Sequence, residues 1–321
     1  MDFLANYFGS LNPMSFLSAL PGNIAQGIIW GLMGLGVFLT FKLLNFADLS
    51  VDGSFATGGA VTAVMLINGC PVWATIIVAI LAGLAAGLVT GLLHTLLGIP
   101  DILAGILTQI ALYSINLNIM GKSNLPISYR NYTLVVSASN INMAILVGLG
   151  ICAVVIAAMY WYFGTEQGST IRSTGSNPAM SKAQGININF TKVIALALSN
   201  GLVALSGSLF AQYRGFADIN MGRGAIVIGL AAVIIGEVLG EAIFRKHMNF
   251  IIRMLFVIVG GILYYIAMGI VLWLKMPTDD TKLFTAIIVA IFLAVPYLQK
   301  KRKTSFKKVA KINAKNAQKE G

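Results

Sequence analysis

Long apolar runs constrain this chain more than any other feature of its sequence. Each of the longer runs has about the 20 residues that a helix needs to cross the hydrocarbon core of a bilayer. Only 10% of the residues are charged, whereas soluble domains have about 25%. We therefore predict an all-α fold, a polytopic membrane helix bundle of about nine transmembrane helices. The runs are residues 24–44, 54–67, 72–97, 102–120, 141–163, 191–212, 225–239, 251–274 and 283–298.

The predicted domain organisation is one transmembrane domain, residues 1–299, followed by a basic tail, residues 300–321. Residues 1–21 hold apolar patches that are too short to span, so we expect an interfacial segment there. The polar interval at 164–190 is the longest before the tail. We expect it to lie in the cytoplasm.

Charge predicts the orientation. The net charge is +11, and nine of the 22 Lys and Arg residues lie in the tail. A basic tail beside a last span is typical of a cytoplasmic terminus near anionic lipid rather than of a nucleic-acid partner, although a solvated, disordered tail fits equally. If nine spans alternate, sixteen Lys and Arg are inside and six outside. The N-terminus is then predicted outside and the C-terminus in the cytoplasm, a result that the tail decides.

A short motif recurs in the two halves of the chain. FADL at 46–49 returns as FADI at 216–219. In each case a long apolar run precedes the motif and a short, glycine-bearing run follows it. On the predicted topology the copies face opposite sides, so spans one to four would be an inverted copy of spans six to nine, with broken helices near the midplane. Chance recurrence is the alternative.

The interval 164–190 contains the pattern of one short helix, residues 177–184. Ser176 or Asn177 can cap its start, Pro178 suits its first turn, and Gly185 can end it. A short capped helix between two membrane spans needs something outside the bilayer to hold it. We therefore expect a protein partner at this helix.

Motifs for catalysis are absent from the sequence. No GxxxxGK loop, HExxH, GxSxG or paired-cysteine metal site occurs, and the chain has two cysteines in all. We predict no catalytic residue, no metal site and no cofactor in this chain. Any coupling to ATP must come from a partner chain that binds ATP and Mg²⁺.

Few polar residues lie inside the spans, which suits a pathway for a small solute better than an ion or proton relay. Amide and hydroxyl groups can bond a substrate's polar ends without burying a charge. Hydrogen bonding between helices is the alternative role, and it is favoured for each residue taken alone. Two carboxylates, Asp48 and Asp52, are expected to cap the broken helix that follows them. The candidate pathway residues are Thr57, Gly58, Gln109, Asn116, Ser199 and Asn200.

Three stretches resemble one protein family. The stretches are STGSNPAMSKAQGIN with the following SNGLVALSGSLFAQ, the early LNFADLSVDGSFATGGA, and GRGAIVIGLAAVIIGE. They resemble segments of bacterial ABC importer permeases of the ribose and branched-chain amino-acid type. The resemblance covers about residues 24–298. The chain is most similar to a branch of this family whose permeases are paired with a lipoprotein receptor and one ATPase. Ribose-type members have a long cytoplasmic N-terminus and an additional first span, and we expect this chain to lack both. The implied coupling helix is Asn177, Pro178, Ala179, Met180, Ser181, Lys182, Ala183, Gln184 and Gly185.

The resemblance implies the non-catalytic permease subunit of an ATP-driven importer in the bacterial plasma membrane, working by alternating access. Its implied partners are a cytoplasmic ATPase, an extracytoplasmic substrate-binding lipoprotein and a second permease copy, as a homodimer. A small polar nutrient is expected as substrate, first an amino acid, including aromatic ones, and second a nucleoside or sugar. An ion-gradient-driven secondary transporter is the alternative function, and a membrane scaffold without transport is a further one.

Overall fold

The computed structural model describes residues 13–129, 132–244, 248–274, 283–291 and 294. Seven of the helices in these ranges are long and apolar enough to cross a membrane, and an eighth apolar helix, α3, is shorter. The chain is therefore a helical, polytopic membrane protein. The elements are α2 (Pro13–Val37), the π-helix η1 (Phe38–Leu43), α3 (Val51–Ile67), α4 (Val72–Thr95), α5 (Asp101–Met120), β1 (Asn124–Pro126), α6 (Ile141–Phe163), α7 (Glu166–Ser176), α8 (Pro178–Ala183), α9 (Ile188–Arg214), β2 (Phe216–Asp218), α10 (Ala225–Phe244) and α11 (Phe250–Trp273).

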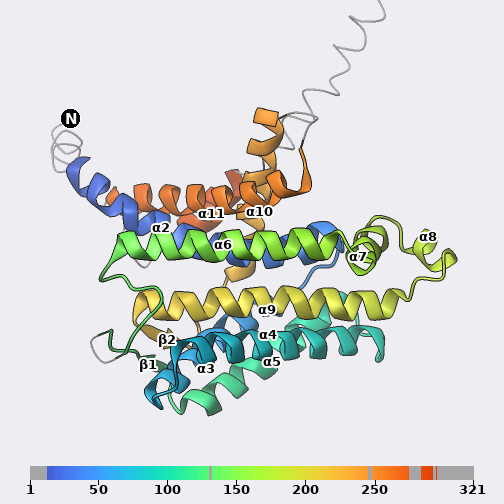
Figure 1. The fold of residues 1–321 in the computed structure, drawn as a ribbon, viewed down its shortest axis with the longest axis horizontal. Helices are drawn as coiled ribbons and strands as arrows, with labels where there is room; N and C mark the ends of the chain where they lie inside the picture. The colour runs from blue at the N-terminus through green and yellow to red at the C-terminus, as the bar shows by residue number, and fades with distance from the viewer. Residues whose placement is uncertain (1–12, 130–131, 245–247, 275–282, 292–293, 295–321) are drawn as a thin grey trace, which may run out of the picture.

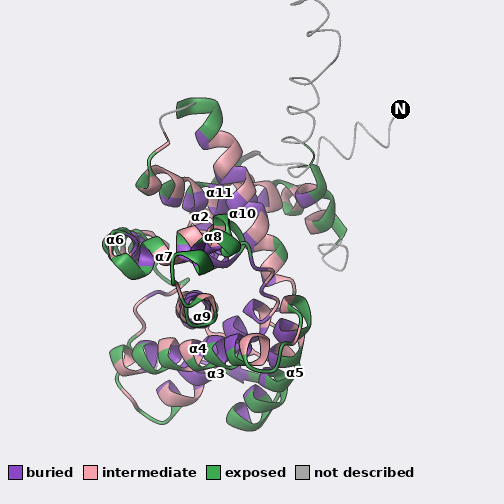
Figure 2. Cartoon of the chain, turned by 90° about the vertical axis from the view of Figure 1, so that its right-hand side faces the viewer, coloured by how far each residue is buried: buried purple, intermediate pink, exposed green. Residues whose placement is uncertain are grey.

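The centre of the bundle is made by α2 and α9, which pack against each other. Their most apolar windows are 83% and 78% buried, whereas those of the other long helices are 28% to 39% buried. In Figure 1, α9 lies between α6 on one side and α3, α4 and α5 on the other. Exposed residues gather on the outer faces of α5 and α6 (Figure 2). Apolar side chains on those outer faces suit lipid or another membrane chain.

The remaining long helices pack on this centre in a swapped pattern. α4 packs along α9, and α11 packs along α2. Glycines permit both contacts, because a side chain at Gly87 would meet the Leu196 carbonyl and one at Gly261 would meet the Gly27 carbonyl. In the predicted repeat, α2 and α9 are first helices and α4 and α11 are third helices. Each half therefore places its third helix on the first helix of the other half, as a two-fold relation requires.

The bundle has two distinct ends. β1 and β2 pair antiparallel at one end, with Asn124 opposite Asp218, and we name it the β end. α7 and α8 lie at the other end, which we name the α8 end (Figure 1). α6 runs from the β end to the α8 end, and α9 returns. The polar interval between α6 and α9 thus lies wholly at the α8 end.

The two copies of the Phe-Ala-Asp motif form the same local turn. The residue before each copy has positive φ: Asn45 at 56° and Gly215 at 74°. The aspartate then accepts a hydrogen bond from the backbone N–H two residues on, at 2.9 Å from Asp48 to Ser50 and 2.7 Å from Asp218 to Asn220. A carboxylate that binds the backbone in this way stabilises a tight turn. The recurrence in sequence is therefore a recurrence in structure.

Some boundaries differ from the prediction. α2 begins at Pro13 and passes through Pro21, so residues 13–21 extend the first membrane helix rather than form a separate interfacial segment. The carbonyl that Pro21 leaves without its helical donor is that of Leu17, a residue that is 57% exposed, so this carbonyl is not buried without a partner inside the bundle. The interval 164–190 holds two helices, α7 and α8, where one was predicted. Part of the ninth predicted span and all of the basic tail lie outside the described residues.

Candidate functional site

Two helices, α3 and α10, begin inside the bundle with their N-termini close together. Asp52 in the first turn of α3 accepts hydrogen bonds from the backbone N–H groups of Gly224 and Ile226, each at 2.9 Å. Ile226 belongs to the first turn of α10. The sequence predicted that Asp52 would cap its own helix, but in the structure it caps the helix of the other half. A carboxylate is favourable there because helix N-termini carry partial positive charge.

Asp48 closes the other side of the same break. It is 2% exposed, and it accepts hydrogen bonds from the Ser50 N–H, the Ser50 hydroxyl and the Asn200 amide. Ser50 is the N-cap residue of α3, and Asn200 lies midway along α9. The buried carboxylate therefore fixes the start of α3 to the middle of a central helix. Its three donors offset the cost of removing it from water.

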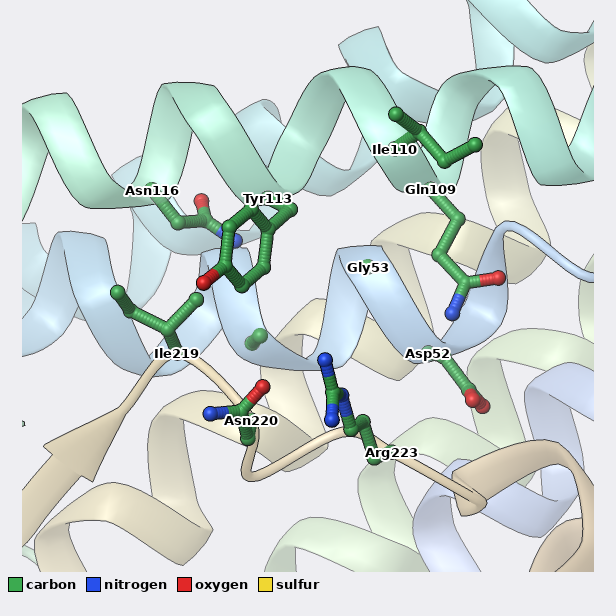
Figure 3. Close-up of a pocket in the computed structure, with 10 residues that line it drawn as sticks. Asp52, Gly53, Gln109, Ile110, Tyr113, Asn116, Ile219, Asn220 and Arg223 are labelled. Carbon is green, nitrogen blue, oxygen red and sulfur yellow. The ribbon is translucent and has the colours of Figure 1, made fainter. Parts of the chain in front are cut away.

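A cavity of about 270 Å³ lies between α3, α5 and the loop that joins β2 to α10. We name it the break cavity, because the α3–α10 break forms part of its wall. Figure 3 shows Asp52 and Gln109 on one side, Asn116 and Tyr113 on the other, and Arg223 reaching between them. Its lining residues are Asp52, Gly53, Ala56, Gln109, Ile110, Tyr113, Asn116, Ile219, Asn220 and Arg223.

The six candidate pathway residues fall into two groups. Gln109 and Asn116 line the break cavity. Three of the other four contact a different segment: Ser199 donates to the Gly36 carbonyl at 2.8 Å, Asn200 binds Asp48 at 2.8 Å, and Gly58 packs against the Ala204 backbone. Thr57 donates to the Gly53 carbonyl of its own helix. The structure thus brings together two of the six at the cavity, and it places the others in helix packing.

Arg223, Asn220 and Tyr113 line the cavity although the sequence analysis did not select them. Tyr113 is on the same helix as Gln109 and Asn116, spaced by about one turn from each, so it shares their face. Arg223 and Asn220 follow the second Phe-Ala-Asp copy. The inverted repeat was the available signal, because it predicts that this second loop returns to the middle of the membrane as the first does.

The second candidate site is α8 at the end of the bundle. Asn177 caps it by accepting from the Met180 N–H at 3.0 Å, Pro178 occupies its first turn, and Gly185 ends it with φ of 83°. All three predicted signals are confirmed. Along α8 only Ser181 is buried, and Met180 is 58% exposed. A short helix that packs on its own molecule through so little surface gains little stability from tertiary contacts.

α7 attaches α8 firmly to the bundle. The Arg172 guanidinium donates to the Phe163 carbonyl at 2.9 Å and lies 5.8 Å from the Phe250 ring centre, so it joins α7 to α6 and α11. Gly175 packs directly against the Leu43 carbonyl at the end of η1. α7 was not predicted because its sequence, EQGSTIRSTGS, has weak helix formers and few apolar residues. Tertiary contacts hold it instead.

Comparison with known proteins identifies the family. Residues 22–296 match the family described as branched-chain amino acid transport system / permease component. The chain belongs to this family. The match spans α3, α10, the break cavity and α8, so the described bundle from residue 22 onward is the family's domain.

Relatives agree with this assignment. The chain is 42% identical over 301 residues to a tyrosine transport system permease protein of Clostridioides difficile, covering 93% of this chain and 99% of the relative. It is 27% identical to the D-allose transport system permease protein AlsC of Escherichia coli, covering 80% and 77%. The family therefore includes members named for different substrates.

A solved structure shares the fold. The chain is similar to PsaBC of Streptococcus pneumoniae in complex with a Fab, with a TM-score of 0.51 and 16% sequence identity, over 91% of this chain and 94% of that one. At this identity the likeness concerns the fold alone. The overall helical arrangement of this chain is thus also found in a solved structure.

Proposed function

We propose that this chain is the membrane-spanning subunit of an ATP-driven importer, and that it moves an amino acid by alternating access. The observation that carries the proposal is the exposed, capped α8, which α7 holds at the end of the bundle. Such a helix is built to be completed by another protein. The family assignment supports an ATPase as that protein.

In this proposal α8 is the coupling helix. The exposed side chains of Ala179, Met180 and Ala183 face away from the bundle, and a groove in a cytoplasmic ATPase would bury them. Closure of an ATPase dimer on ATP would then displace α8. The chain itself contributes no catalytic residue.

A continuous set of contacts can carry that displacement to the break. α8 follows α7 directly, and α7 packs through Gly175 on the end of η1. From η1, Lys42 forms an ion pair with Glu237 of α10 at 2.8 Å. The chain then leads from η1 to Asp48 and α3. A π-helix inside a membrane span is a common place for such a change, because its hydrogen bonding is easily rearranged.

The break cavity is the proposed position of the substrate in the pathway. It has hydrogen-bonding amides and one charge of each sign in its wall. On its α5 side the cavity is lined by Ile110, which is exposed, and Leu103 and Leu107 of the same helix are exposed as well. A second copy of the chain against α5 would close that side, which favours a homodimer with the pathway between the copies.

The proposed substrate class is amino acid, supported by the 42% identical relative named for tyrosine transport. The allose permease among the relatives keeps sugar as the alternative class. We propose further that α8 and the C-terminal tail are cytoplasmic and that the β end faces outward. A substrate-binding lipoprotein would dock at the β end and deliver its ligand.

Transport in proteoliposomes tests the energy source. The chain is purified with whatever ATPase co-purifies, and uptake of labelled L-tyrosine, L-leucine, uridine and D-ribose is measured with the matching receptor. We expect uptake of an amino acid that requires ATP and that ionophores leave unchanged. Uptake without ATP, driven by a proton or sodium gradient, would replace this proposal with the secondary transporter.

A further inference from the structure

The break cavity contains two opposite charges that do not neutralise each other. Asp52 and Arg223 both line it, yet among the described residues no ion pair joins them within 4.0 Å. Asp52 accepts backbone hydrogen bonds from Gly224 and Ile226, one on each carboxylate oxygen, and the Ala225 N–H also bonds this carboxylate, which leaves acceptor capacity for one further donor. The Arg223 guanidinium forms no hydrogen bond or ion pair within the described part of the chain, and it reaches into the cavity (Figure 3). A carboxylate and a guanidinium that form no ion pair with each other in one small cavity complement a ligand that carries both charges.

A third group in the cavity is a buried amide without a partner. The side chain of Asn116 is 0% exposed, and neither its oxygen nor its nitrogen has a hydrogen-bond partner in the described part of the chain. A buried amide without a partner loses its hydrogen bonds to water and gains none in return, so such a group is usually paired or serves a ligand. An amide can both donate to and accept from a hydroxyl.

The remaining lining has an aromatic and apolar part next to that amide. Tyr113 lies one turn before Asn116 on α5, and its ring is beside the amide in Figure 3. Tyr113 is 44% exposed, so its ring is accessible for stacking on another ring. Ile219 and Ile110 add apolar surface. This part of the cavity suits a flat ring with one polar end.

We propose that the break cavity binds a zwitterionic α-amino acid whose aromatic side chain ends in a hydroxyl. Asp52 binds the α-ammonium group, Arg223 binds the α-carboxylate, the Tyr113 ring stacks on the ligand's ring, and Asn116 bonds its hydroxyl. The inference deepens the proposed function, on which it rests, by assigning a recognition group to each part of the substrate. It also places selectivity in the membrane subunit.

Competition binding tests the assignment group by group. The full chain in lipid nanodiscs binds labelled L-tyrosine, and the competitors are L-phenylalanine, tyramine and 3-(4-hydroxyphenyl)propionate. Each competitor lacks one group: the hydroxyl, the carboxylate or the amine. A ligand that lacks a hydrogen bond to a charged group, or to a buried polar group of the cavity, binds about tenfold or more weakly. We expect each competitor to be weaker than L-tyrosine by that factor.

Variants should remove one preference at a time. In Asn116→Leu, L-phenylalanine should compete as well as L-tyrosine while tyramine stays weak. In Arg223→Gln, tyramine should compete as well as L-tyrosine, while L-phenylalanine should remain weaker than L-tyrosine. Lys122→Gln removes a cation that does not line the cavity, and it should behave as the parent chain. Because each readout is a ratio within one variant, a partial loss of folded protein does not imitate it.

The outcomes separate this inference from the proposed function. Unchanged ratios in both Asn116→Leu and Arg223→Gln would overturn the inference, and so would a parent chain that does not discriminate among the four ligands. ATP-dependent amino-acid uptake by the same preparations would in that case leave the proposed function standing. Absence of amino-acid uptake in the proteoliposome experiment, together with absence of binding here, would remove both.

Discussion

The turn at 45–50 and the turn at 215–220 have the same backbone pattern in different surroundings. Asp48 in the first turn is 2% exposed and binds Asn200 of α9, so it joins the two halves of the chain. Asp218 in the second is only partly buried, and it lies 3.4 Å from the exposed Asn124 at the β end. The second turn continues into Asn220 and Arg223, which line the cavity. One local motif therefore stabilises the break in the first half and forms the cavity wall in the second.

This difference explains how an inverted repeat can serve an asymmetric task. The Phe-Ala-Asp sequence determines a turn through local hydrogen bonds, and these are equal in both copies. What each turn touches depends on residues far away in the chain. Small sequence changes outside the motif are thus enough to make one copy a structural joint and leave the other to face a ligand.

The largest difference between the copies should appear when each aspartate is removed. Asp48→Ala removes the buried acceptor of the Ser50 N–H, of the Ser50 hydroxyl and of one N–H of the Asn200 amide, whose nitrogen keeps its bond to the Leu196 carbonyl. We expect a loss of about 3 kcal/mol in unfolding free energy.

Asp218→Ala loses the turn bond from the exposed Asn220 and a long bond from the exposed Asn124 amide, and we expect about 1 kcal/mol or less because water can replace both. Unfolding in mixed SDS micelles measures both. Equal losses in the two variants would contradict the assigned roles.

A second test asks whether the swapped helix contacts are equivalent. Gly87→Ala on α4 and Gly261→Ala on α11 each push a methyl group into the backbone of a central helix. We expect similar losses of about 1–3 kcal/mol in unfolding free energy, the usual cost of overpacking. Gly150→Ala on α6 is the matched control, since nothing lies within 4 Å of the added carbon. If only one of the two contact variants were destabilised, the two-fold relation would not extend to packing.

The smallest effect concerns the residue that precedes each motif. Gly215→Ala places a side chain at φ of 74°, which costs about 1–2 kcal/mol for an L-residue. Asn45→Gly keeps φ of 56° accessible. We expect its unfolding free energy to change by no more than about 0.5 kcal/mol, as is usual for surface substitutions. The same SDS titration resolves the two. A larger loss for Asn45→Gly would mean that the Asn45 side chain, and not its backbone, holds the first turn.

The membrane fold could be predicted because hydrophobic run length alone defines most spans. The Phe-Ala-Asp repeat added the break between α3 and α10, since four residues sufficed to form each turn. The α8 helix could be predicted from local chemistry as well: Asn177, Pro178 and Gly185 act within one turn of their own positions.

Other features depend on contacts between distant segments and could not be predicted. Asp52 had the right chemistry to cap a helix, but the sequence could not show that its partner would be α10, 172 residues away. Arg223 carried no local signal for a cavity. α7 forms because Gly175 and Arg172 fit against η1 and α6, and neither contact is visible in a local pattern.

The central claim is that α8 joins this membrane chain to an ATPase. Affinity purification of the full chain from detergent-solubilised membranes, with identification of the co-purifying proteins, tests it most directly. The diagnostic variant is Ala183→Asp, which puts a charge on the exposed face of α8, and the matched control is Ala138→Asp, an equally exposed alanine on the loop that contacts α9 at the β end. We expect an ATPase to co-purify with the parent chain and with Ala138→Asp but not with Ala183→Asp, because a charge buried at an interface without a partner costs several kcal/mol. Co-purification that is unchanged in Ala183→Asp, or a parent chain that purifies without any ATPase, would contradict the account.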